Sequence, residues 1–260
     1  MRSERPPLVL AALAGVGAAF FILPLAGLLY RAPWQTALAE LTTPEALTAL
    51  RLSFVVSLAA TGLALLLGVP LAWIYARVRF RGRDVVRALT TLPMILPPVV
   101  GGVALLFAFG RRGLFGQALD AIGIRLPFTT FGAILAATFV AMPFLVLTVE
   151  AGLRSMDRRY EDAARTLGAD RWTVFRRVTL PLIAPSVFAG AVLCWARALG
   201  EFGATITFAG NLPGTTQTLP LAVYIALETR PEVAIMLSLV LLAISLAILV
   251  AMRDRYLRAF

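Results

Sequence analysis

The chain has 260 residues, of which 60% are hydrophobic, and a formal net charge of +10. Soluble domains are about 45–50% apolar, and several segments here lack charge for roughly 20 residues, the length a helix needs to cross the hydrocarbon core. The composition therefore indicates an integral membrane protein, and the positive-inside rule explains the basic charge better than nucleic-acid binding does, so we expect no nucleic-acid partner. With no histidine and one cysteine, Cys194, a Cys/His metal site and a disulfide within the chain are excluded.

Hydropathy predicts an all-α membrane protein with six transmembrane helices in a single transmembrane domain, residues 1–260. We expect an N-terminal span and external loop over residues 1–48 and a core over 49–252. A signal peptide is the alternative for the first span, but its apolar run exceeds the about 7–15 residues of a signal h-region, and no A-x-A site follows. The first span is expected to lie peripheral to the other five. The predicted spans are Leu8–Tyr30, Leu52–Tyr75, Leu89–Phe109, Phe131–Leu153, Ser186–Phe208 and Val233–Met252.

The positions of the arginines orient these spans, because cytoplasmic loops carry an excess of basic residues. Of the 24 basic residues, all arginines, 17 lie on one side: Arg2, Arg5, Arg77, Arg79, Arg81, Arg83, Arg87, Arg154, Arg158, Arg159, Arg165, Arg171, Arg176, Arg177, Arg253, Arg255 and Arg258. Six lie on the other side: Arg31, Arg51, Arg111, Arg112, Arg125 and Arg230. This bias predicts that both termini and the loop over residues 154–185 are cytoplasmic.

The sequence of the loop over residues 154–185 predicts a short helix followed by an amphipathic segment. Asp157 can cap a helix that starts near Arg158, Glu161 and Asp162 favour its first turns, and Gly168 permits the turn that ends it. An amphipathic segment follows, with Trp172, Phe175, Val178 and Leu180 as its apolar residues. Pro181 and Pro185 are expected to break this segment before the next span. A solvated basic loop is the alternative interpretation.

Two charged residues, Arg197 and Glu201, lie within the fifth predicted span, where charge is costly and usually faces a bundle interior or a water-filled cavity. Their spacing of four places them on one helix face, with Thr205 one turn further. Gly200 and Gly203 would let another helix approach closely. The pair is either a structural ion pair or part of an anion path in which Glu201 holds Arg197 in place.

Prolines interrupt two of the predicted spans. Pro93, Pro97 and Pro98 lie in the third span and Pro143 lies in the fourth. Such breaks are tolerated where they are buried or line a cavity. They predict either a kinked gate, with Pro97, Pro98 and Pro143 as candidate residues, or a simple packing irregularity.

Outside the membrane, Arg111, Arg112 and Arg125 outnumber Asp120 in one loop. This excess of positive charge either attracts an oxyanion or an acidic partner, or belongs to a solvated loop.

The segment DAARTLG over residues 162–168 and the Leu-Pro at 180–181 resemble the "EAA loop" of ABC importer permeases, E-A-A-x-x-x-G followed by an apolar-x-L-P. Asp162 stands where the family usually has glutamate, with Glu161 beside it. The resemblance implies that this loop is a coupling helix that docks on a cytoplasmic ATPase. By position, the residues implied in coupling are Asp162, Ala163, Ala164, Gly168, Leu180 and Pro181.

From Leu52 to Met252 the chain resembles bacterial molybdate ABC permeases, most specifically in ARALGEFGATITFAGN over 196–211 and NLPGTTQTLP over 211–220. Similar, too, are LPPVVGG over 96–102 and GRRGLFG over 110–116. Gly-Glu-Phe-Gly alone is shared with sulfate/thiosulfate permeases, which are the alternative. The resemblance implies a translocation path with the candidate residues Arg197, Glu201, Thr205 and Asn211.

The same resemblance implies the type I importer fold in the bacterial cytoplasmic (inner) membrane. Two copies of the chain would form the pathway for molybdate or tungstate by alternating access. Two ATPase subunits would hold ATP and Mg, and an extracytoplasmic molybdate-binding protein would dock outside. The chain itself would bind no cofactor and no metal and would not be an enzyme.

Two other classes of function fit the sequence less well. An intramembrane enzyme would need a nucleophile or an acid/base set at depth, and the chain has no histidine, while Cys194 has no obvious base. A proton-coupled secondary anion carrier would need titratable relay groups and would not need the 162–168 motif.

Overall fold

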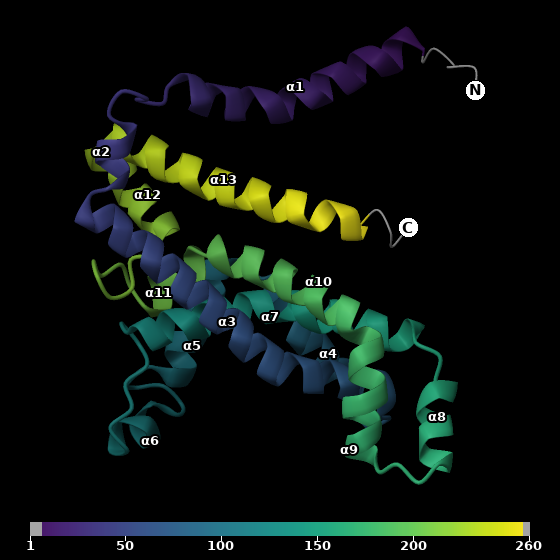
Figure 1. The fold of residues 1–260 in the computed structure, drawn as a ribbon. Helices are drawn as coiled ribbons and strands as arrows, with labels where there is room; N and C mark the ends of the chain where they lie inside the picture. The colour runs from purple at the N-terminus through teal and green to yellow at the C-terminus, as the bar shows by residue number, and fades with distance from the viewer. Residues whose placement is uncertain (1–6, 257–260) are drawn as a thin grey trace.

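The structure, a computed structural model, describes the backbone of residues 7–256 and the side chains of residues 7–251. Arg2, Arg5 and Arg258, which contribute to the predicted orientation, lie outside the described residues, as do the side chains of Arg253 and Arg255. All regular secondary structure in the described residues is helical (Figure 1). Its elements are α1 (Leu8–Tyr30), α2 (Ala37–Leu41), α3 (Pro44–Arg77), α4 (Arg83–Thr91), the 3₁₀ helix η1 (Leu92–Met94), α5 (Pro98–Phe109), α6 (Gly116–Ala121), α7 (Thr130–Ser155), α8 (Arg159–Thr166), α9 (Arg171–Val174), the π-helix η2 (Phe175–Thr179), α10 (Leu180–Leu199), α11 (Gly203–Phe208), α12 (Leu219–Thr229) and α13 (Pro231–Tyr256).

Five helical segments within the described residues are long and apolar enough to cross a membrane. They are α1, α3, α7, the continuous helix Arg171–Leu199 and residues Pro231–Ala251 of α13. Five of the six predicted spans fall on these segments. The second starts earlier than predicted, at Pro44, because Thr43 caps α3 by accepting a hydrogen bond from the Ala46 backbone N–H and Pro44 occupies the first turn.

The third predicted span, Leu89–Phe109, is wrong as a continuous helix. The chain forms α4, then η1, and restarts as α5 at Pro98, with Pro97 as its N-cap. Proline lacks a backbone donor and disfavours a helical conformation in the residue before it. The prolines therefore divide this segment, as their positions predicted, into two shorter pieces.

The predicted fifth span, Ser186–Phe208, is also wrong in its bounds. The helix runs from Arg171 to Leu199, ends at Gly200, and α11 follows as a separate short helix. Pro181 and Pro185 do not break the helix, because Pro181 lies in the first turn of α10 and the π-helix η2 precedes it. Such π turns bend helices without ending them.

Pro143 likewise does not interrupt its span. It is buried inside α7, which is continuous over 26 residues. The short helix α12, which packs on α13, was not predicted.

The core of the bundle lies between α3, α7 and α10. Its members are mostly small, including Ala60, Ala64, Ala137 and Ala141, which are fully buried. A Cβ at Gly68 of α3 would come within 2.9 Å of the Leu145 side chain of α7, so a larger residue there would require that side chain to shift. Small residues at the contact let helix backbones pack closely, which is the main source of helix association in a membrane.

In Figure 1 the first turn of α1, the last turns of α13, and helices α8 and α9 lie at the right-hand end of the bundle. Helices α2 and α6 lie at the opposite end. Helix α1 buries none of its residues and contacts the rest through α13, in agreement with the expected peripheral position.

Candidate coupling surface and translocation path

Helix α8 carries the predicted coupling motif and is short because both of its ends are marked by the sequence. Asp157 Oδ1 accepts a hydrogen bond of 2.9 Å from the Arg159 backbone N–H just before the helix. Gly168 follows the helix with φ of +85°. At this left-handed position the backbone N–H of Gly168 and of Ala169 donate to the carbonyls of Arg165 and Ala164. The turn predicted at Gly168 is confirmed, and Asp157 binds the first backbone N–H of the helix, although the N-cap residue is Arg158 and not Asp157.

The two adjacent acids of α8 have opposite environments. Asp162 points outward, with 68% of its side chain exposed, and within the described residues its carboxylate has one loose ion pair, with Arg165 at 3.5 Å. Glu161 is buried, with 5% of its side chain exposed; Arg77 Nε lies 3.0 Å from its Oε2, and the Thr179 hydroxyl donates to its Oε1 over 2.7 Å. From the sequence, Asp162 was assigned to coupling, and the buried contacts of Glu161 with Arg77 and Thr179 were not predicted.

Through Glu161, α8 is tied both to the last residue of α3 and to η2. A second connection runs through aromatic rings, because Trp172 of α9 stacks on Phe175 with centroids 5.7 Å apart. Phe175 in turn meets Trp73 of α3 edge-on at 6.3 Å. Packed side chains and an ion pair therefore connect α8 and α9 to α3.

The outer surface of this loop exposes large apolar side chains. Leu167 is 89% exposed, Trp172 65% and Tyr160 58%. Ala163 is exposed and Ala164 half-buried, so the Ala-Ala step leaves room for another surface. Leu180 and Pro181, at the start of α10, are half-buried and exposed respectively. Exposed apolar surface rimmed by polar residues can mark a protein–protein or a membrane interaction site.

A second buried carboxylate at this end, Glu150 of α7, was not identified from the sequence. Its side chain is 1% exposed and lies between Arg87 of α4, at 3.0 Å, and Arg154, at 2.6 Å. The i, i+4 spacing of Glu150 and Arg154 is the sequence signal that could have revealed the pair. Arg87 could not have been found, because only the tertiary structure places α4 beside α7.

Arg197 and Glu201 form the predicted ion pair, with Arg197 Nη2 2.7 Å from Glu201 Oε2. The contact is an ion pair without hydrogen-bond alignment, since Oε2 accepts no hydrogen bond within the described residues. The sequence predicted that Arg197, Glu201 and Thr205 lie on one helix, and this is wrong. Helix α10 ends at Leu199, between Arg197 and Glu201, and Thr205 belongs to α11. Instead Glu201 Oε1 accepts a 2.8 Å hydrogen bond from the Ala204 backbone N–H at the start of α11.

Glycine lets α11 lie directly against α5. A Cβ on Gly203 would meet Pro98 at 3.0 Å, and one on Gly102 would meet Thr207 at 2.6 Å. The close approach predicted for Gly203 is therefore confirmed. The one predicted for Gly200 is wrong, since a Cβ there would have its nearest neighbour, the Ala196 carbonyl, at 3.9 Å.

The remaining path candidates are Thr205 and Asn211. Thr205 is buried in α11, and Asn211 follows Gly210 in the loop before α12, with Oδ1 buried and unpartnered among the described residues. Thr216 organises this loop, accepting from the Leu212 N–H over 2.9 Å and donating to the Gly210 carbonyl. Within the described residues, no hydrogen bond or ion pair joins Thr205 or Asn211 to the Arg197–Glu201 pair.

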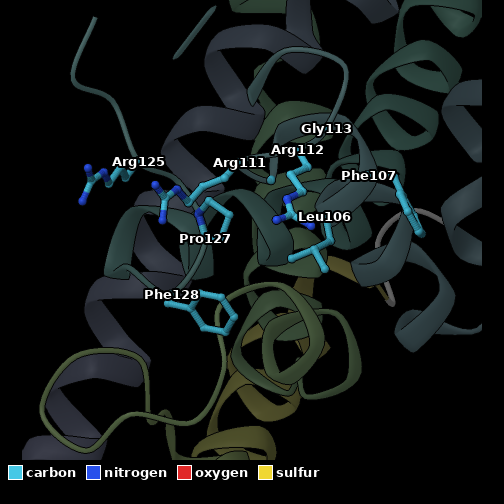
Figure 2. Close-up of a pocket in the computed structure, with 9 residues that line it drawn as sticks. Leu106, Phe107, Arg111, Arg112, Gly113, Arg125, Pro127 and Phe128 are labelled. Carbon is cyan, nitrogen blue, oxygen red and sulfur yellow. The ribbon is translucent and has the colours of Figure 1, made fainter. Parts of the chain in front are cut away.

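At the opposite end of the bundle from α8, an apolar cavity of about 460 Å³ is bordered by Arg111, Arg112 and Arg125 (Figure 2). Arg125 pairs with Asp120 at 3.1 Å, and 68% of its side chain is exposed. Arg111 and Arg112 have no ion pair within the described part of the chain. The excess positive charge predicted for this loop is therefore carried by these two residues.

Long apolar helices around a core of small residues, with a charged helical loop at one end, define a multi-pass α-helical membrane protein. The chain belongs to the family of inner membrane components of binding-protein-dependent transport systems, whose family model matches residues 64–259. It is therefore the membrane component of an ABC transporter and not its ATPase.

Among individual relatives, the molybdenum transport system permease protein ModB of Mycobacterium tuberculosis is 47% identical over 95% of this chain and 92% of its own length. The sulfate transport system permease protein CysT of Salmonella typhimurium is 36% identical over 88% of this chain and 84% of its own length. A crystal structure of a bacterial alginate ABC transporter has a chain with a TM-score of 0.72 and 21% identity, covering 96% of this chain and 94% of that chain. This last likeness shows the ABC importer permease fold.

Proposed function

We propose that this chain is the subunit through which an ATP-driven importer moves molybdate, or the nearly equal-sized tungstate, across the membrane. The observation that supports the substrate is the difference between the two relatives, 47% identity to a molybdenum permease against 36% to a sulfate permease, over similar shares of the chain. Sulfate or thiosulfate is the second candidate substrate, because the sulfate permease also matches most of the chain.

The exposed face of α8 is the proposed docking site for the ATPase. Its contact residues are Asp162, Ala163, Ala164 and Gly168, with Leu180 and Pro181 at the start of α10 completing the surface. The support is geometric, because Glu161 fixes α8 to α3 from behind and leaves Asp162, Leu167 and Trp172 free to meet a partner. A movement of the ATPase would then reach α3 and α10.

The proposed assembly holds two copies of this chain, two ATPase subunits that bind ATP and Mg, and a molybdate-binding protein at the end that carries α6. In this arrangement both termini and α8 are cytoplasmic. The broken segment α4–η1–α5 would supply the sixth crossing. Arg111 and Arg112, beside the apolar cavity, would lie on the side from which the oxyanion arrives.

Within the membrane, Arg197 is proposed to lend positive potential to the path while Glu201 holds it. Arg197 suits this part because 28% of its side chain is exposed, whereas Glu201 is 2% exposed and caps α11. Thr205 and Asn211 would line the path further along. The breaks at Pro97 and Pro98, and the buried Pro143, are the proposed gate positions.

Uptake by proteoliposomes that hold this chain with its ATPase and binding protein tests the proposal. We expect molybdate uptake that needs ATP on the ATPase side and persists with sulfate in excess. Uptake of sulfate, or suppression by it, would move the substrate to the second candidate. Uptake that ignores ATP and collapses with the proton gradient would overturn the coupling assignment.

A further inference from the structure

A second cavity, of about 530 Å³, lies at the end of the bundle that carries α8. It is enclosed by the end of α3, the segment that leads into α4, and the segment that follows α7. None of its lining residues is acidic, and five are basic: Arg77, Arg79, Arg83, Arg154 and Arg158. The cavity is thus a concentration of positive charge that neither the coupling surface nor the translocation path uses.

The charge in this cavity is only partly compensated. Arg77 pairs with Glu161 and Arg154 with Glu150. Arg79, Arg83 and Arg158 have no ion pair within the described residues, and Asp84 lines an adjoining hollow beside Arg79 and Arg83 rather than this cavity. Three uncompensated guanidinium groups around one hollow repel one another unless an anion lies between them.

Two nitrogens of these arginines are buried donors without an acceptor. Arg77 Nη2 and Arg83 Nε have no hydrogen-bond partner within the described part of the chain. Only 8% of the Arg77 side chain is exposed, and its Nε is already engaged by Glu161. Native proteins rarely leave a buried charged donor unsatisfied, because desolvation without a partner is costly.

We propose that this cavity binds a tetrahedral oxyanion group, supplied either by the phosphate of an anionic lipid head group or by a free oxyanion in solution. Guanidinium groups present donors in a fork that matches such oxygens, and several arginines together suit a divalent or lipid-linked phosphate. Basic pockets between membrane helices commonly hold lipid head groups, and a soluble oxyanion offers the same oxygens.

Occupancy would stabilise the joint between α3, α4, α7 and α8. Arg77 lies in that joint and lines the cavity; its Nη2 has no hydrogen-bond partner among the described residues, and its Nε is held by the carboxylate of α8. An anion in the cavity would therefore fix Arg77 from one side while Glu161 holds it from the other. This binding needs no ATPase, binding protein or transport.

The test uses the full chain in nanodiscs and measures its melting temperature and the lipids that it retains. One arm compares phosphatidylcholine alone with phosphatidylcholine containing phosphatidylglycerol or cardiolipin. The other arm titrates inorganic phosphate or molybdate into neutral discs, against chloride at the same ionic strength. Stabilisation in the lipid arm identifies a head group, and stabilisation by phosphate or molybdate identifies a free oxyanion.

Arg83→Gln and Arg79→Gln remove charge from the cavity, and Arg81→Gln is the matched control, because Arg81 is exposed in the same segment and does not line the cavity. Loss of one charge-assisted hydrogen bond should weaken binding about tenfold in Arg83→Gln, with the control unchanged. An equal response of the control and the cavity variants overturns the proposal. So does the absence of stabilisation in both arms.

Discussion

Buried carboxylates are handled differently at the α8 end of the molecule and at the break between α10 and α11. At the α8 end, Glu161 and Glu150 each join elements distant in sequence through arginines, Arg77 for the first and Arg87 for the second. At the break, the partners of Glu201 among the described residues are near neighbours in sequence, Arg197 and the Ala204 N–H. The first arrangement fixes separate helices to each other, while the second stabilises one local change of helix direction.

This difference indicates where each region resists change. A long-range ion pair transmits movement between helices, which suits a surface that has to pass on the motion of a partner. A local pair and cap instead hold a broken helix in place beside α5, where Gly102 and Gly203 leave no room for side chains. Four substitutions would break or sharpen this comparison.

The largest effect is expected from Glu161→Ala. Removing the carboxylate leaves Arg77 buried without its partner, at a cost of about 3–5 kcal/mol, and frees α8 from α3. Stability should fall strongly and ATPase association with it, as measured by thermal melting in detergent and by copurification. Asp162→Ala is the control: it removes an exposed acid and should leave the melting temperature unchanged. Equal destabilisation by both would contradict the assigned roles.

Gly168→Val should uncouple the chain while leaving it inserted. Its φ of +85° is left-handed, which costs a β-branched residue about 1–2 kcal/mol and should deplete the docking-competent loop about tenfold. Gly123→Val is the matched control, because Gly123 has φ of +76° and open space where a Cβ would be added, but it lies beside α6. ATP-driven uptake should fall in the first variant alone, and normal uptake by Gly168→Val would refute the coupling role.

Arg197→Gln should have an intermediate effect, because it leaves the buried Glu201 without its ion pair, at about 1–3 kcal/mol. The Ala204 cap survives, so the break between α10 and α11 should persist. Comparing uptake with thermal stability separates the two interpretations. If the pair is structural, Arg197→Gln and Glu201→Gln should both lower stability, and uptake should fall only in proportion to the loss of folded protein. A path residue predicts that Arg197→Gln lowers uptake more than stability.

The smallest effect is expected at Asp170, which caps α9. The hydroxyl of Thr173 and the backbone N–H of Trp172 donate to its carboxylate and hold the pKa of Asp170 below its ordinary value. The contribution of this cap is therefore fully present above the ordinary aspartate pKa and is lost as the pH falls through the lowered pKa. Asp170→Ala should increase hydrogen exchange at Trp172 near neutral pH, and unchanged exchange would exclude the cap.

Prolines show why sequence reasoning succeeded in one place and failed in another. Pro97 and Pro98 divide the third span, as expected, because two consecutive prolines remove donors and also constrain the residue before them. Pro143, Pro181 and Pro185 were expected to interrupt helices and do not. Pro143 is buried against neighbouring helices, Pro181 lies in the first turn of α10, and a π turn precedes α10. None of these features can be read from the sequence alone.

The sequence by itself determined the class of the protein. Apolar runs of membrane length, the placement of arginines, and the glycine that ends α8 follow from local chemistry, which needs no partner to be recognised. Only the tertiary structure decided which acids matter. Glu161 and Asp162 are chemically similar neighbours, yet one is buried against Arg77 and the other is exposed, because helix packing brings the end of α3 to one face of α8. The arginine cavity has the same origin, since its members are spread from residue 77 to residue 158.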